Sequence, residues 1–123
     1  LTSVKRARLH CYAIENLLLC DESLARCNQT PESCLAIIQA WITQQPQHPS
    51  SPQLAALAES FETRRIRRIK DVRNMLVGLL GIVKPWEVHV GHLIAGTFDR
   101  SNQSENSLRV YLGTGVLTKL FPQ

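Results

Sequence analysis

The sequence predicts a mainly α-helical protein, a compact bundle of about five to six helices, and three observations support this class. The chain has 123 residues, a length that suits a single domain with one core. Hydrophobic residues make up 44% and charged residues 20%, which are ordinary values for a globular protein. Apolar residues recur every three or four positions along most of the chain, which is the periodicity of amphipathic helices.

We expect residues 1–123 to form one helical domain. The chain begins with Leu1 rather than Met and lacks a charged-then-apolar leader, so we also expect it to be cut from a larger protein. No apolar run reaches the roughly 18 residues that a membrane-spanning helix needs. The sequence therefore predicts neither a targeting peptide nor a membrane span.

Two helices are predicted at the start of the chain. Apolar side chains keep helical spacing from Val4 to Leu18, which predicts a helix over about residues 3–20. Two acids and a serine at 21–23 are capping residues. Residues 21–27 are therefore predicted as a second short helix or as a continuation after a kink.

The third helix is predicted from its cap. Thr30 suits the N-cap, Pro31 the first helical position and Glu32 the positive end of the helix dipole. An apolar face continues this helix to about residue 44. The prolines that follow make residues 45–52 a surface loop within the domain.

A long helix is predicted over about residues 51–83, with a bend near 62–63. Ser51 and Pro52 repeat the cap-then-proline start. An apolar stripe then runs through Phe61, Ile66, Ile69 and Val72 to Val83 with some angular drift, and Lys84 and Pro85 end the helix.

The last third of the chain fits two structures. Residues 86–96 and 108–120 can form helices, or strands, the second as a short β-hairpin around Gly113. We favour helices because Leu93, Ile94 and Phe98, and then Leu108, Tyr111 and Leu112, keep helical spacing. Residues 99–106 are polar and are predicted as a loop.

Positive charge is concentrated in one stretch. The formal net charge is +4, and residues 64–73, which we call the basic segment, contain only one acid, Asp71. A smaller cluster, Lys5, Arg6 and Arg8, lies near the start. The basic side chains of the segment are Arg64, Arg65, Arg67, Arg68, Lys70 and Arg73.

Helical periodicity divides these side chains into two groups. Arg64, Arg67, Arg68 and Lys70 are predicted to point into solvent, away from the apolar stripe. Arg65 falls within the stripe and Arg73 on its flank, so each must extend to water or pair with an acid. The available acids include Glu15, Glu59, Glu62 and Glu87.

This charge pattern predicts a non-catalytic helical interaction module. Clustered arginines bind phosphates and carboxylates, so the expected partner is an anionic macromolecule: nucleic acid, a nucleoprotein or an acidic protein surface. All six basic side chains of the segment are candidate binding residues. An intracellular location, cytoplasmic or nuclear, is favoured, and viral replication and nucleocapsid proteins offer an analogy for such a regulatory module.

Two alternative functions stay open. The first is a protein–protein adaptor or homo-oligomer that associates through an apolar face. The second is a secreted helical-bundle ligand held by disulfides among Cys11, Cys20, Cys27 and Cys34, whose pairing the sequence does not determine.

Catalysis, metals and cofactors are not predicted. The cysteines lack the closely spaced pairs typical of zinc sites, and a site built from His10, Cys11, His89 and His92 would draw on distant segments. No nucleophile elbow or glycine-rich phosphate loop accompanies the cysteines and histidines. The thiols are instead predicted to be buried as small apolar side chains.

Overall fold

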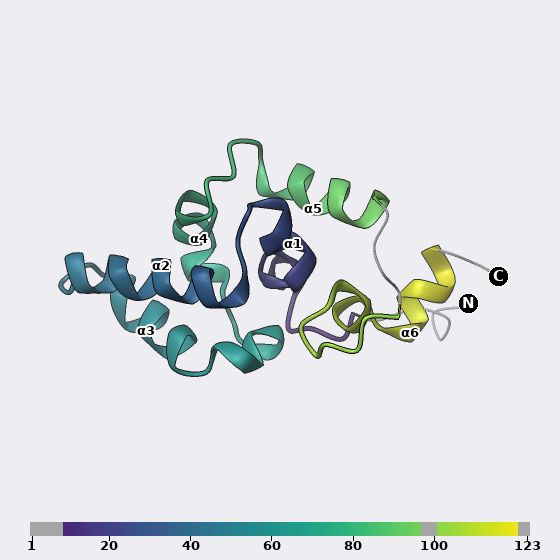
Figure 1. Ribbon diagram of the computed structural model, residues 1–123, viewed down its shortest axis with the longest axis horizontal. Coiled ribbons are helices and arrows are strands. Elements are labelled where there is room, and N and C mark those ends of the chain that lie inside the picture. Colours follow the sequence, from purple (N-terminus) through teal and green to yellow (C-terminus); the bar gives the residue numbers. More distant parts are fainter. Residues whose placement is uncertain (1–8, 97–100, 121–123) are drawn as a thin grey trace.

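The computed structural model describes residues 9–96 and 101–120, and this part of the chain is mainly helical and contains no strand. Helix α1 lies at the centre, α2 and α3 lie side by side at one end, and α6 lies toward the other end (Figure 1). In chain order the elements are the 3-10 helix η2 (Ile14–Leu19), α1 (Asp21–Arg26), α2 (Pro31–Gln44), α3 (Ser51–Glu59), the 3-10 helices η3 (Phe61–Ile66) and η4 (Lys70–Val72), α4 (Arg73–Leu79), α5 (Trp86–Ala95) and α6 (Leu108–Leu120).

Two clusters of buried side chains form the interior. The first joins α1 to α2, α3 and α4, and the second joins η2 to α5 and α6. They meet at residues 16–20, which are fully buried: Leu18 belongs to the second cluster and Leu19 to the first. The single core expected from chain length is thus divided into two clusters, which share the partly buried Ile82.

Helix α2 begins and ends where the sequence predicts. The Thr30 hydroxyl accepts a hydrogen bond from the Ser33 amide at 3.0 Å, and the Ser33 hydroxyl accepts one from the Thr30 amide at 2.8 Å. This reciprocal cap satisfies two amides that the first helical turn leaves unpaired. Pro31 occupies the first helical position, as expected.

The predicted helix over residues 3–20 is wrong in its described part. Residues 9–13 are not helical, and only Ile14–Leu19 form a helix, of the 3-10 type. The His10 amide donates to the Tyr111 carbonyl at 2.8 Å, and the Tyr12 amide donates to the Arg65 carbonyl at 3.0 Å. Amides that an α-helix would use internally therefore bind distant segments instead. The residues predicted before position 9 lie outside the described part.

The long helix predicted over residues 51–83 is divided into four shorter helices. Helix α3 ends at Glu59, and Thr63 departs from helical geometry at the predicted bend. A second break follows at Arg67, whose backbone is extended (φ −88°, ψ 142°). The Asn16 side chain explains this break, because its amide donates to the carbonyls of Arg64 at 3.0 Å and Arg67 at 2.6 Å. Helix α4 then ends at Leu79, before the left-handed Gly81 (φ 72°).

The last third of the chain is helical where we favoured helices. Helix α5 spans Trp86–Ala95, and α6 spans Leu108–Leu120 with a break at Gly113, where φ is 79°. A side chain at Gly113 would also meet the His10 ring, since an added Cβ would lie 2.9 Å from it. No strand occurs at 101–120, so the hairpin alternative is not seen there. Phe98 and residues 99–100 of the predicted loop lie outside the described residues.

A helix that crosses a membrane must be long and apolar. Within residues 9–96 and 101–120, every helix is too short or too polar to cross a lipid bilayer.

Candidate anion-binding segment

Arg64 is buried, and its predicted place on the solvent face is wrong. Residues 61–66 form a 3-10 helix, in which side chains three positions apart lie above one another, so Arg64 lies on the same side as the buried Phe61. The guanidinium lies over the Phe61 ring, 4.6 Å from its centroid. With 2% of its surface exposed, Arg64 is not available to a partner.

The Arg64 guanidinium instead links three segments inside the protein through hydrogen bonds. It donates to Asp21 Oδ1 at 2.8 Å, to the Leu19 carbonyl at 2.7 Å and to the Phe61 carbonyl at 2.9 Å. The other carboxylate oxygen of Asp21 accepts from the Ser104 hydroxyl at 2.7 Å. A charged side chain placed this deep needs such a full set of partners, so its role is structural.

Arg67, Arg68 and Lys70 are exposed, as the sequence predicts. Arg67 Nε donates to the Thr63 hydroxyl at 3.2 Å, and the Arg68 guanidinium lies 3.8 Å from the Asp71 carboxylate, with both side chains more than half exposed. An ion pair that is this long and this exposed stabilises the protein very little, so the Arg68 guanidinium remains available to an anion. These three cations are the solvent-facing part of the basic segment.

Arg65 and Arg73 find partners other than the acids we considered. The half-buried Arg65 donates from Nη1 to the His10 carbonyl at 2.5 Å. Arg73 places its guanidinium 4.9 Å from the centroid of the Trp86 ring, and its buried Nε has no hydrogen-bond partner among the described residues. Both side chains therefore contribute to packing between segments. Arg65 also lines a small hollow with Glu62 and Glu105, so acids border the segment on that side.

Exposed apolar side chains lie beside the exposed cations. Ile66, predicted on the buried stripe, is 54% exposed because the 3-10 helix turns it outward. Tyr12 is 58% exposed, and its backbone is bonded to that of Arg65. No sequence pattern predicts this contact, because residues 12 and 65 are far apart in the chain. An aromatic ring therefore accompanies a basic segment in which the sequence alone places none on the surface.

The four cysteines are free thiols. Cys20 and Cys34 are buried in the two clusters, and burial raises the pKa of all four side chains, that of Cys11 and of Cys34 to about 11. A raised pKa keeps a thiol protonated and weakly nucleophilic at neutral pH. Among the described residues, no three His, Cys, Asp or Glu side chains are grouped closely enough to hold a metal ion.

The chain was also compared with known proteins. Comparison with models of protein families, with curated proteins and with solved structures found no match.

Proposed function

We propose that this chain is a non-catalytic interaction module, a small helical bundle, that binds an anionic macromolecule through the exposed half of its basic segment. The binding side chains are Arg67, Arg68 and Lys70, with Arg65 at the border and Tyr12 next to Arg65. Single-stranded nucleic acid is the partner that this surface suits best. Arg64 and Arg73, which the sequence predicts as binding residues, instead make contacts that stabilise the fold.

The observation that carries this proposal is the combination of exposed cations with an exposed aromatic ring. Three exposed cations, whose one ion pair within the described residues is the long and exposed contact of Arg68 with Asp71, attract a phosphate backbone and release its counterions. Tyr12 adds a flat surface on which a base can stack, worth about 1–3 kcal/mol per base. An acidic protein would use the charges but would gain less from an isolated ring.

Binding of a fluorescently labelled single-stranded oligonucleotide, followed by anisotropy, tests the proposal. Arg67→Glu with Arg68→Glu should weaken binding at least about tenfold, because two attractive charges become repulsive. The matched control is the quadruple variant Gln39→Glu, Gln44→Glu, Gln47→Glu and Gln53→Glu, which changes the net charge equally at four exposed positions outside the basic segment. Equal losses in the double variant and in this control, or no binding by the wild-type chain, would overturn the proposal.

Tyr12→Ala separates nucleic acid from an acidic protein partner. Removing the ring should cost oligonucleotide binding about fivefold or more, while binding to an acidic polypeptide such as polyglutamate should change little. If polyglutamate binds as tightly as the oligonucleotide and ignores Tyr12, the partner is an acidic protein.

The adaptor and secreted-ligand alternatives give different results. Self-association through Ile14, Ile66 and Tyr12, which are exposed, would appear in light scattering as a concentration-dependent mass that salt does not reduce. A disulfide-held ligand would show fewer than four thiols on titration in denaturant without reductant.

A further inference from the structure

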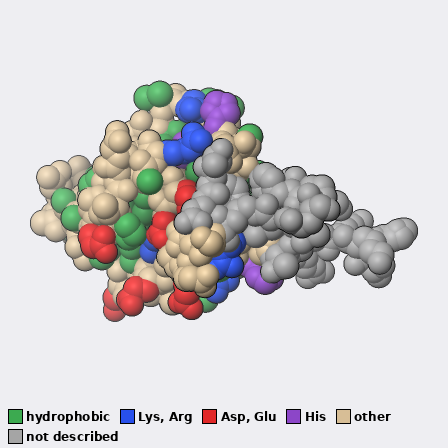
Figure 2. All heavy atoms as spheres, turned by 45° about the vertical axis from the view of Figure 1, so that its right-hand side comes forward, with side chains coloured by type: hydrophobic (Ala, Val, Ile, Leu, Met, Phe, Trp, Pro, Cys, Tyr) green, Lys and Arg blue, Asp and Glu red, His purple; other side chains and the backbone are tan. Residues whose placement is uncertain are grey.

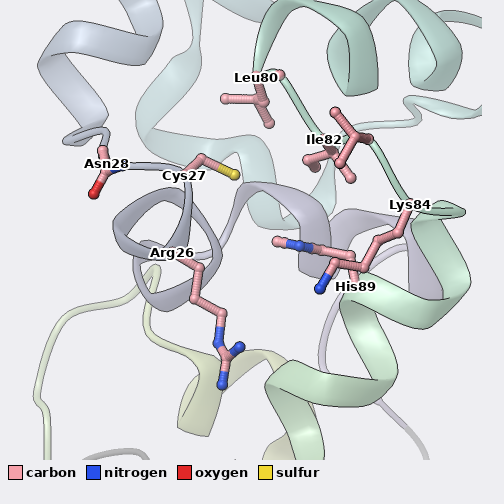
Figure 3. Close-up of a pocket in the computed structure, with 9 residues that line it drawn as sticks. Arg26, Cys27, Asn28, Leu80, Ile82, Lys84 and His89 are labelled. Atoms are coloured by element: carbon pink, nitrogen blue, oxygen red, sulfur yellow. The ribbon is translucent and has the colours of Figure 1, made fainter.

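A hollow of about 300 Å³ lies between the end of α1, the turn over residues 80–84 and the first half of α5. Figure 3 shows Lys84 and His89 together on one side of the hollow, with Leu80 and Ile82 above them and the Cys27 thiol at the side. On the surface, Lys or Arg side chains gather with a histidine at the upper edge of the face in Figure 2. The hollow is separate from the basic segment.

Two cations, Arg26 and Lys84, line the hollow together with His89 and the Asn28 amide, and its described lining contains no carboxylate. His92 lies next to both cations, because Lys84 Nζ is 3.3 Å from its Nδ1 and Arg26 Nη2 is 3.4 Å from its carbonyl. His89 is buried and its Nε2 is bonded to the Ser23 hydroxyl at 2.8 Å, while its Nδ1 has no hydrogen bond to the described residues. A ring nitrogen is therefore left for a ligand.

Within the described residues, no carboxylate forms an ion pair with Lys84 or Arg26. The acids of α1 are committed elsewhere, Asp21 to Arg64 and Glu22 to the Leu108 amide at 2.7 Å. Glu87 of α5 is exposed and makes no ion pair within the described residues. Burial lowers the pKa of His89, and Lys84, Arg26 and His92 lower it further, so the field at the ring is positive.

We propose that this hollow binds the phosphate group of a small phosphate monoester through Lys84, His89 and Arg26, which line it, with His92 beside Lys84. A dianionic phosphate offers oxygens to the lysine, the guanidinium and the His89 ring and neutralises charge that the protein leaves unbalanced. The volume lies at the lower end of ligand-binding pockets, which favours a small molecule over a polymer. Leu80, Ile82 and Val83, which is 98% exposed at the rim, offer apolar contact to the organic part of the ester.

The histidine ring signals in NMR spectra report binding directly. Inorganic phosphate and phenyl phosphate are titrated at constant ionic strength, with sodium chloride as the balancing salt. Both should shift the His89 and His92 signals to saturation, and phenyl phosphate should bind more tightly because its ring adds apolar contact. Binding should also move the pKa of His89 up toward its ordinary range, because the anion favours the protonated ring over the repulsion of Lys84, Arg26 and His92.

Two variants make the test specific. Lys84→Ala removes an exposed side chain and should weaken phosphate binding about tenfold, whereas Lys70→Ala, an exposed lysine of the basic segment, should not change it. Arg67→Glu with Arg68→Glu should also leave it unchanged, so this proposal and the nucleic-acid proposal fail separately. Histidine signal shifts that sodium chloride alone reproduces, or an affinity for phosphate that is unchanged in Lys84→Ala, would overturn the site. Tighter binding of a phosphoserine peptide, or of vesicles containing phosphatidic acid, than of phenyl phosphate would overturn the small-molecule assignment.

Discussion

At the scale of single residues, the basic segment contains two kinds of arginine. Arg64 is buried and bonded to Asp21 and two carbonyls, whereas Arg67, three positions later, is exposed. Arg64→Ala should lower the free energy of unfolding by about 3–5 kcal/mol, because it removes a hydrogen-bond partner from the partly buried Asp21 carboxylate and from both carbonyls. Arg67→Ala should change it by less than about 0.5 kcal/mol. Urea denaturation of the two variants measures the contrast, and similar midpoints would show that Arg64 does not link the three segments.

His89 makes stability depend on pH. Burial and the cations Lys84, Arg26 and His92 lower the pKa of this ring in the folded state, so below pH about 6.5 the unfolded chain binds more protons. The contribution of neutral His89 to stability should therefore be fully present above that pH, and the free energy of unfolding should fall as the pH drops from 7 toward 5. His89→Gln, which can keep the bond to Ser23, should flatten this fall, while the exposed His92→Ala should retain most of it. Thermal denaturation between pH 5 and 7 would show the difference, and an equal slope in wild type and His89→Gln would contradict it.

At the scale of helices, the Asn16 side chain decides where two predicted helices break. Its amide donates to the carbonyls of Arg64 and Arg67, and its Oδ1 accepts from the Ala13 amide at 3.1 Å. Asn16→Ala should cost roughly 2–4 kcal/mol, because it leaves several backbone groups without partners. Hydrogen exchange should show lost protection at Ala13 and in residues 61–67 first. Unchanged exchange there would mean that other contacts set these breaks.

The helices that sequence predicts well are those with local signals. The Thr30–Ser33 cap, the proline at position 31 and the helical spacing of α5 act within one or two turns, so periodicity and capping identify them. The helices over residues 3–20 and 51–83 were predicted too long because distant contacts override local periodicity. The exposure of Arg67, Arg68 and Lys70 was predicted, whereas Arg64 and Ile66 were misplaced because an α-helical wheel does not describe a 3-10 turn. The position of Tyr12 next to Arg65 could not be predicted from a sequence pattern, since it depends on a tertiary contact.

At the scale of the molecule, the two buried clusters meet at the segment Leu17–Cys20, so we expect them to unfold together. Each cluster has its own tryptophan, Trp41 in the first and Trp86 in the second. In Trp41→Phe and in Trp86→Phe, the remaining fluorescence and the far-ultraviolet circular dichroism should give one coincident urea transition. Leu18→Ala should lower both reporters' midpoints together, at a cost of about 2–5 kcal/mol. Separate transitions would mean that the clusters fold independently.

The same architecture determines which surface is left for a partner. Arg64 forms hydrogen bonds inside the protein, and Arg65 and Arg73 pack between segments. Three of the six basic side chains therefore contribute to the fold. The remaining three are exposed to solvent, and the exposed Tyr12 is hydrogen-bonded through its backbone to Arg65 of the same segment. The salt dependence of binding counts such contacts, because each neutralised phosphate of a single strand contributes about 0.7 to the slope of log affinity against log salt.

The most direct test of the binding surface is therefore this slope for a single-stranded oligonucleotide, measured for the wild-type chain and for Arg67→Gln with Arg68→Gln. We predict that the double variant lowers the magnitude of the slope by about 1.4, the equivalent of two phosphate contacts at about 0.7 each. A slope that is the same in both proteins would contradict the assignment of these two arginines to the binding surface.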